Sequence, residues 1–150
     1  MGINVRPFVE SDRPALAAIL DESPAFSPEA VRVALEMVCP DYTLFVAELD
    51  GNLCGYACIG PTPFTLATWH LYWIAVHPKV QGRGVGRAIQ AYVEQHVIAS
   101  NGQRLVVETS GRPDYVRSRR FYEASGYSVA GRIADYYKPG DDCVFYCKVL

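Results

Sequence analysis

Three glycines alternate with other residues in the segment 81–87, Gln-Gly-Arg-Gly-Val-Gly-Arg, and this pattern is typical of a loop that binds an anion. Glycine has no Cβ atom, so successive backbone N–H groups can converge on one ligand without a clash. A helix that begins in the loop adds roughly half a positive charge at the same place. Arg83 and Arg87 flank the glycines and can add their own charge. The sequence therefore predicts a site for a phosphate or pyrophosphate group.

The residues on either side of this loop are expected to form the strand and the helix that such a site requires. A β-branched and aromatic run from about Trp69 to Val76 stops at His77-Pro78. After the loop, apolar residues recur at helical spacing over roughly 84–100. The apolar run 104–109 is suited to a strand buried on both faces. We therefore expect a crossover with two parallel strands, whose carboxyl ends are the usual place for a ligand.

Further strands and helices are expected before and after this crossover. Hydrophobic periodicity and turn residues indicate strands at 3–8, 44–49, 53–59, 127–137 and 143–149, and helices at 11–21, from 27 to before Pro40, and at 115–125. Ser11 is the expected N-cap of the first helix. The Asp50-Gly51 pair is the expected turn of the first hairpin.

Length and composition favour a single domain, residues 1–150, that binds a small anion. Half of the residues are hydrophobic, which is enough for one sizeable core. A net charge of -2 argues against a partner made of duplex nucleic acid, which normally requires a basic surface. Five cysteines, an odd number, and no apolar N-terminal segment favour a reducing, cytoplasmic location without a membrane partner.

Two pairs of cysteines raise the question of a metal site. Cys54 and Cys58 form one pair, and Cys143 and Cys147 form the other. Each pair falls in an expected strand, where residues four apart share a face but stand ~13 Å from each other. That separation is too long for one zinc ion, so we expect no metal and interpret these cysteines as small buried residues.

Two motifs resemble those of the GNAT superfamily of N-acetyltransferases. The first is Gln-x-x-Gly-x-Gly at 81–86, directly after a strand that ends in Ala-Val-x-Pro. The second is Phe121-Tyr122, with Gly126 and an aromatic residue following four and five positions after the tyrosine. The order of the expected elements is also similar over nearly the whole chain. The segment Asp135-Tyr136-Tyr137, followed by two aspartates, is similar to the ribosomal-protein alanine N-acetyltransferases in particular.

This resemblance implies a fold and a reaction. The fold would be α/β with a mixed sheet of about seven strands and helices on both faces. The reaction would move the acetyl group of the cosubstrate acetyl-CoA to a primary amine, by direct attack in a ternary complex. The acceptor would be an amino acid, another small-molecule amine or a peptide N-terminus. A homodimer is left open.

The resemblance also assigns roles to residues. The coenzyme's pantetheine arm would pair like an added strand with the backbone of Ile74, Ala75 and Val76. Its pyrophosphate would be held by the loop residues Gln81, Gly82, Arg83, Gly84, Val85, Gly86 and Arg87. Tyr136 and Tyr137 would be walls of the acceptor site, where their acidic neighbours suit a cationic amine.

Tyr122 and Glu108 would be the catalytic residues. Tyr122 would be the general acid for the departing thiolate; because a phenol has a pKa near ~10 and a thiol near ~8.5, it would act first as a strong hydrogen-bond donor. Glu108 would be the general base, although a carboxyl needs burial or a water relay to take a proton from an ammonium. His70 and His77 are alternative bases.

One departure from the family concerns the segment 111–115. The related enzymes place an asparagine between the glutamate and the tyrosine, whereas this chain has Gly-Arg-Pro-Asp-Tyr there, two residues longer. The resemblance therefore leaves open whether this segment contacts the coenzyme.

Two other functions remain as alternatives. A nucleotide-binding Rossmann domain also has a strand, glycines and a helix, but its Gly-x-Gly-x-x-Gly spacing differs from the Gly-x-Gly-x-Gly found here. A non-catalytic sensor or interaction module with the GNAT fold would keep the coenzyme site without turnover. The presence of Tyr122 favours the enzyme.

Overall fold

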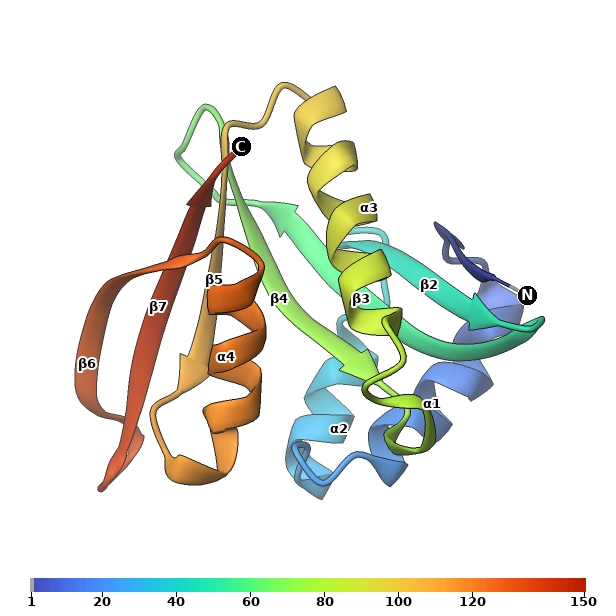
Figure 1. Ribbon diagram of the computed structural model, residues 1–150, viewed down its shortest axis with the longest axis horizontal. Helices are drawn as coiled ribbons and strands as arrows, with labels where there is room; N and C mark the ends of the chain where they lie inside the picture. The colour runs from blue at the N-terminus through green and yellow to red at the C-terminus, as the bar shows by residue number, and fades with distance from the viewer. Residues whose placement is uncertain (1) are drawn as a thin grey trace. The chain divides into compact units, whose positions relative to one another are not determined.

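Seven strands and four helices make up the described residues, 2–150, of the computed structural model (Figure 1). The strands are β1 Ile3–Pro7, β2 Thr43–Leu49, β3 Asn52–Pro61, β4 Thr68–Val76, β5 Arg104–Ser110, β6 Ser128–Lys138 and β7 Asp141–Val149. The helices are α1 Arg13–Glu22, α2 Pro28–Glu36, α3 Val85–Ala99 and α4 Val116–Ala124, with 3-10 turns at Glu10–Asp12, Pro78–Val80 and Pro113–Tyr115. None of the helices in this part of the chain is long and apolar enough to cross a membrane.

The strands form one mixed sheet in the order β1-β2-β3-β4-β5-β7-β6. β4 and β5 are parallel, with Thr68–Leu71 paired to Arg104–Val107, and α3 lies between them in the sequence. The predicted crossover and the predicted seven-stranded mixed sheet are therefore confirmed. The pairs β1·β2, β2·β3, β5·β7 and β6·β7 are antiparallel.

The internal contacts divide the chain into two units, which we describe separately. The first unit comprises Met1–Gly60 and Trp73–His96, with β1, β2, β3, the end of β4, α1, α2 and most of α3. The second comprises Pro61–Tyr72 and Val97–Leu150, with the start of β4, β5, α4, β6 and β7.

In the first unit, helices cover both faces of the sheet. Leu44 and Val46 of β2 belong to a buried cluster with α1 and α2, whose members also include Leu16, Ile19, Leu20, Val31 and Ala34. Phe45 lies between these two residues, so its side chain leaves the strand on the other face. There it packs edge-on against Tyr92 of α3, with ring centroids 4.9 Å apart. The predicted placement of helices on both faces is therefore confirmed for this unit.

Gly55 of β3 lets the first turns of α3 lie close to the sheet. A Cβ atom at this position would lie 3.0 Å from the carbonyl oxygen of Ala75 and 3.1 Å from the side chain of Ile89. Both contacts are tighter than ordinary van der Waals contact, so the absence of a side chain at Gly55 fixes how near the helix and the end of β4 can approach. This packing positions the N-terminus of α3.

In the second unit, α4 packs on one face of β5 and β7. Tyr122 of α4 contacts the ring of Tyr146 in β7, with centroids 6.1 Å apart, and the Tyr146 hydroxyl donates to Glu123 at 3.2 Å. Leu105 and Val107 of β5 are fully or almost fully buried. Gly126 ends the helix with a φ of 92°, a conformation that suits glycine, as the sequence predicts.

Two local predictions are wrong. Ser11 is not the N-cap of α1, because a 3-10 turn over Glu10–Asp12 comes first and Asp12 precedes the helix; the Asp12 carboxylate accepts from the Val9 N–H at 2.9 Å. β5 is not buried on both faces, because Val106 and Glu108 are only half-buried while Leu105 and Val107 are buried. The apolar composition of the strand conceals this alternation, and the half-buried face carries Glu108.

Candidate active site

The glycine loop of the first unit joins the end of β4 to the start of α3. Gly82 and Gly84 have φ values of 80° and 89°, which residues with a side chain rarely adopt. Position 84 requires glycine because of this backbone conformation and not because of crowding. A Cβ atom there would meet only the side chain of Ile3, at 3.8 Å. The Gln81 side chain donates to the carbonyl of Val76 at 3.3 Å and so ties the loop to the strand. The exposed backbone at a helix N-terminus fits a phosphate group.

The other predicted loop residues take different positions. Gly86 lies in the first turn of α3, so its amide belongs to the helix start rather than to the turn. Arg83 and Arg87 are exposed, and Val85 is buried, which leaves only the backbone of Val85 for a ligand. The loop thus offers amide groups and two exposed positive charges to an anion.

His77, an alternative base in the sequence analysis, has structural contacts. Its Nδ1 atom accepts from the N–H of Lys79 at 3.2 Å, which caps the 3-10 turn after β4. Its Nε2 atom contacts the carboxylate of Glu22 at the end of α1. These contacts hold the imidazole between the 3-10 turn and the end of α1.

The last residues of β4, Ile74, Ala75 and Val76, come after the part of the strand that pairs with β5. That pairing ends at Leu71, whereas β4 continues to Val76. Backbone groups in a part of a strand that follows its last paired residue can pair with an extended ligand. This is the arrangement that a pantetheine arm would use.

Tyr122 lies in a cluster of aromatic rings in the second unit. It is 7% exposed and packs edge-on against Phe121 and Tyr127, with centroids 5.3 Å and 5.7 Å away. Burial raises the pKa of the Tyr122 phenol above its ordinary value near 10. The hydroxyl is therefore protonated at neutral pH and can donate a hydrogen bond or a proton.

Glu108 and Tyr122 lie on opposite faces of the second unit. It pairs in register with Phe145 of β7, whereas the preceding residue pairs with Tyr146, which contacts Tyr122. Successive side chains of a strand alternate between faces, so the candidate base and the candidate acid lie on different faces of β5 and β7. The sequence identifies both residues as candidates, but it does not show that their side chains lie on different faces.

His70 lies beside Glu108. Its Nε2 atom is 3.6 Å from Oε1 of Glu108, and its ring stacks on Tyr72 with centroids 4.6 Å apart and planes at 23°. Burial lowers the pKa of His70 below its ordinary 6.5, and the nearby Glu108 opposes this shift only in part. The imidazole is therefore mostly neutral at pH 7.

Tyr136 and Tyr137 are near Glu108, as the proposed role of walls requires. The two rings contact each other at 5.0 Å, and Tyr136 packs edge-on against Phe145 at 6.0 Å. The pKa of Tyr136 is raised, first of all by the negative charge of Glu108. The Tyr137 hydroxyl donates to the sulfur of Cys143 at 3.6 Å. Both tyrosines are about half exposed, at 47% and 48%.

The aspartates near these tyrosines have structural partners, and the expectation that they suit a cationic amine stays a prediction. Asp142 accepts from Nε of Arg132 at 2.9 Å and from the N–H of Asp135 at 3.0 Å. Asp135 has a φ of 55° and accepts from the N–H of Gly140 at 2.8 Å. Asp141 is buried and accepts from the Ser110 hydroxyl. Asp135 and Asp142 hold the irregular part of β6 between Ile133 and Lys138, which carries both tyrosines, and Glu108 lies near these rings.

Hydrogen bonds from side chains and backbone hold the longer segment 111–115 in one conformation. Arg119 of α4 donates to the carbonyl oxygens of Ser110 and Arg112, at 2.7 Å and 2.8 Å. The N–H of Arg112 donates to the Ser110 hydroxyl at 3.1 Å. An arginine and a serine therefore hold the backbone of this segment.

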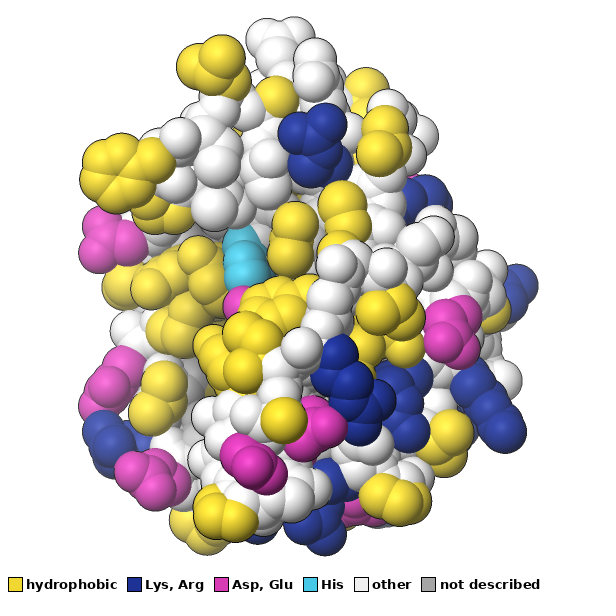
Figure 2. All heavy atoms as spheres, turned by 90° about the vertical axis from the view of Figure 1, so that its left-hand side faces the viewer, with side chains coloured by type: hydrophobic (Ala, Val, Ile, Leu, Met, Phe, Trp, Pro, Cys, Tyr) yellow, Lys and Arg dark blue, Asp and Glu magenta, His cyan; other side chains and the backbone are white. Residues whose placement is uncertain are grey.

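Two residues of this face are absent from the sequence-based candidates. Tyr72 stacks on His70, and Phe145 lies opposite Glu108. The spacing of His70 and Tyr72, two apart in a strand, is a signal that they share a face. We call Tyr72, Tyr136, Tyr137 and Phe145, which surround His70 and Glu108, the aromatic face. Figure 2 looks onto this side of the molecule and shows hydrophobic side chains gathered around a histidine and an acidic side chain.

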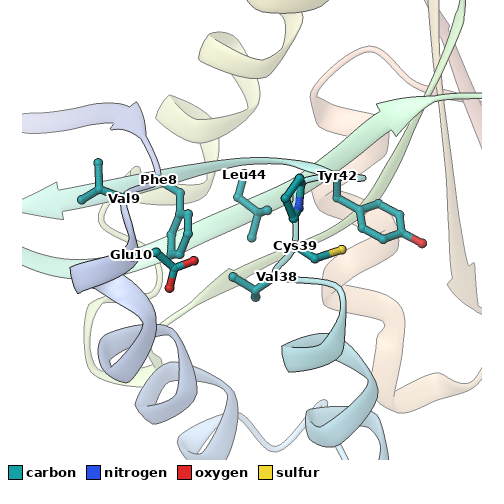
Figure 3. A pocket seen from close by; sticks show the side chains of 8 residues that line it. Phe8, Val9, Glu10, Val38, Cys39, Tyr42 and Leu44 are labelled. Carbon is teal, nitrogen blue, oxygen red and sulfur yellow. The ribbon is translucent and has the colours of Figure 1, made fainter.

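A separate hollow in the first unit carries no comparable chemistry. Its volume is about 320 Å³, and it is lined by Phe8, Val9, Glu10, Val38, Cys39, Pro40, Tyr42 and Leu44 (Figure 3). Its carboxylate, Glu10, is paired with Arg13 at 2.9 Å. Within residues 2–150, no three His, Cys, Asp or Glu side chains gather as a metal site requires.

Comparison with known proteins agrees with this architecture. The sequence matches the Acetyltransferase (GNAT) family over residues 13–127. A crystal structure from Desulfovibrio desulfuricans, assigned to the GNAT acetyltransferases, is 36% identical, covers 99% of both chains and superposes with a TM-score of 0.94. No curated protein sequence matches the chain.

More distant structures share the fold. The ribosomal-protein-S18-alanine N-acetyltransferase of Escherichia coli is 20% identical with a TM-score of 0.82, over 99% of this chain and 94% of that one. An aminoglycoside 6'-N-acetyltransferase complexed with coenzyme A is 17% identical with a TM-score of 0.82, over 97% and 96%. Because the family match spans most of the chain, this protein belongs to the GNAT family of acetyltransferases.

Proposed function

We propose that this protein transfers the acetyl group of acetyl-CoA to a primary amine by direct attack in a ternary complex. The observation that carries the proposal is the glycine loop: Gly82 and Gly84 have positive φ values, and α3 begins one residue after Gly84. Such a loop presents amide groups and the positive end of a helix to a pyrophosphate. Arg83 and Arg87 would add charge, and the backbone of Ile74, Ala75 and Val76 would pair with the pantetheine arm.

Glu108 and Tyr122 would divide the proton chemistry. In the attack of the amine nitrogen on the thioester carbonyl, a C–N bond forms, the C–S bond breaks, and one proton leaves the nitrogen while the sulfur gains one. Before the attack, an acceptor that binds as an ammonium has to lose one proton to become nucleophilic. Glu108 would take this proton, directly or through a water molecule, on the aromatic face. Tyr122 would donate to the sulfur that carries the developing negative charge. The two side chains lie on different faces of β5 and β7.

Burial of Tyr122 refines its role. Its pKa is raised, so complete transfer of its proton to a thiolate is more unfavourable than for an exposed phenol. A strong hydrogen bond to the sulfur still stabilises the transition state, with transfer completed late. This supports Tyr122 as a donor that matters most when the C–S bond breaks.

The test measures binding and turnover separately. Calorimetry with acetyl-CoA should show binding to the purified protein, and a coenzyme A release assay should show turnover with amines but not with hydroxyl compounds. Binding without turnover of any amine would instead identify a sensor with the GNAT fold. Turnover restricted to hydroxyl acceptors would contradict the proposed amine.

We also infer a cytoplasmic location. All five cysteines are free thiols, and three of them are buried in the sheet. A reducing compartment keeps cysteines in this form. Mass spectrometry of alkylated protein from the source cells should find all five cysteines reduced. A disulfide in that material would contradict the inference.

A further inference from the structure

The aromatic face combines a single carboxylate with several π systems. Glu108 lies next to His70 at 3.6 Å and opposite Phe145 in register, and its charge reaches the hydroxyl of Tyr136. His70 in turn stacks on Tyr72. An ammonium group is attracted both by a carboxylate and by the faces of aromatic rings.

We propose that Glu108, His70 and the rings of the aromatic face bind the acceptor as a primary amine with one positive charge and an apolar body. This inference rests on the proposed function, which leaves the class of amine open. The ammonium would lie at Glu108, and the apolar body would lie on the exposed rings of Tyr136 and Tyr137. Ile133 of β6, which is 48% exposed and pairs in register with Cys143, extends the apolar surface on this face.

The preference for a single charge follows from the pairing of the other acidic groups. Asp142 binds Arg132 and the Asp135 N–H, Asp141 binds Ser110, and Asp135 binds the Gly140 N–H. Asp114, in the loop before α4, is paired with Arg112 at 3.2 Å. Arginines neutralise Asp142 and Asp114, and Asp141 is buried, so Asp135 alone among these four keeps an exposed charge without a cationic partner. A second ammonium that does not reach Asp135 would have to displace an arginine or lie against apolar rings, and both are unfavourable.

His70 contributes in its neutral form. Glu108 from β5 is the charged group beside it, and Tyr72, on its own strand β4, stacks on its ring. A neutral imidazole does not repel an ammonium and offers a nitrogen lone pair as a second acceptor. A protonated imidazole would instead pair with Glu108 and compete with the acceptor.

The first experiment measures amine binding without turnover. Calorimetry in the absence of acetyl-CoA would compare 2-phenylethylamine with spermidine and with kanamycin, and we expect the monoamine to bind at least roughly tenfold more tightly. The Tyr136→Leu variant keeps an apolar side chain but loses the π system, which should weaken binding of the monoamine about three- to tenfold. The Tyr136→Phe variant keeps the ring and should bind the monoamine more tightly than Tyr136→Leu does.

A charge variant completes the test. Glu108→Gln should weaken binding of the monoamine roughly tenfold or more. Asp114→Asn removes the same charge from the loop before α4 and should leave binding unchanged. Equal weakening in both variants would show only a general effect of net charge and would overturn the proposal.

Failure of this inference is distinguishable from failure of the proposed function. If polyamines or aminoglycosides are acetylated faster than apolar monoamines at equal concentration, the acceptor class is wrong while the acetyltransferase function stands. If no amine is acetylated but 2-phenylethylamine still binds in a manner that depends on Glu108 and Tyr136, the amine site stands and the proposed reaction is wrong. If 2-phenylethylamine binds no more tightly to the unmodified protein than to Tyr136→Leu, the aromatic face is not the acceptor site.

Discussion

Phe145 and Tyr146 are neighbours in β7, yet their rings lie on opposite faces of the second unit. Phe145 is opposite Glu108 and contacts Tyr136, whereas Tyr146 is opposite Val107 and contacts Tyr122. The pleat of a single strand therefore separates the candidate base from the candidate acid. Each can be altered without disturbing the packing of the other, which makes the following experiments interpretable.

Replacement of Tyr122 by phenylalanine should lower kcat about a hundredfold or more, because it removes the donor to the departing thiolate. The ring is retained, so its contacts with Tyr127 and Tyr146 persist and the affinity for acetyl-CoA should stay near that of the unmodified protein. Steady-state kinetics and calorimetry provide the two measurements.

The matched control is Tyr127→Phe, which removes a hydroxyl from the neighbouring buried ring of the same cluster. Its kcat should remain within a few-fold of the original. A Tyr122→Phe protein with unchanged kcat would show that the thiolate needs no phenol and that Tyr122 is a packing residue.

Replacement of Gly84 by valine should weaken acetyl-CoA binding strongly. The φ of 89° disfavours any side chain, so the loop has to change its conformation and the amide groups lose their common direction. Calorimetry with acetyl-CoA measures the loss.

Gly51→Val serves as the control for backbone strain. Gly51 has a φ of 82°, and a Cβ atom there would meet nothing within 4 Å, so the substitution introduces similar strain in a hairpin turn of the same unit. The two variants should lose similar thermal stability, and only Gly84→Val should lose coenzyme affinity. Equal affinities in the two folded variants would contradict the role of the loop.

Stability should depend on pH through His70. Its pKa in the folded protein lies below 6.5, so the unfolded chain binds a proton more readily. The free energy of unfolding should therefore fall as the pH is lowered from about 6.5 through the pKa of the folded state, and it should be restored above that range. Urea unfolding at several values between pH 5 and 8 gives the curve.

The unfolding free energy of the original protein minus that of His70→Gln, taken at each pH, isolates the contribution of His70, because the carboxylates titrate in both proteins. The variant should lose less stability on acidification over this range. An identical loss in both proteins would mean that His70 has an unperturbed pKa. The kcat/KM for the amine should also decline less steeply at acid pH in the variant.

Asp12, not Ser11, should contribute to the stability of the first unit. Asp12 is buried and binds Arg6 through two hydrogen bonds of 2.9 Å, and these bonds lower the pKa of its carboxyl. Asp12→Ala should cost about 1–2 kcal/mol of unfolding free energy, whereas Ser11→Ala should cost little. The contribution of Asp12 should vanish as the pH falls through its lowered pKa, because a protonated carboxyl no longer pairs with Arg6. A larger loss for Ser11→Ala in urea unfolding would restore Ser11 as the cap.

The sequence predicts the elements better than it predicts their contacts. The strand, glycines and helix around residues 69–100 are local signals, and so are the hairpin turn at Asp50-Gly51 and the helix end at Gly126. The aromatic face depends on β7 lying between β5 and β6, an order that no local pattern contains. The aspartates near Tyr136 show the same limit, because their partners Arg132 and Ser110 become neighbours only after the strands pair.

The early end of the pairing between β4 and β5 also has a consequence for the lifetime of the protein in the cell. A ligand that pairs with the backbone of Ile74, Ala75 and Val76 binds the folded chain and not the unfolded one. By mass action, a ligand at a hundred times its Kd adds about 2.7 kcal/mol to the free energy of unfolding. The fraction of unfolded chains open to proteases would then fall about a hundredfold. The abundance of this protein would therefore follow the supply of its coenzyme.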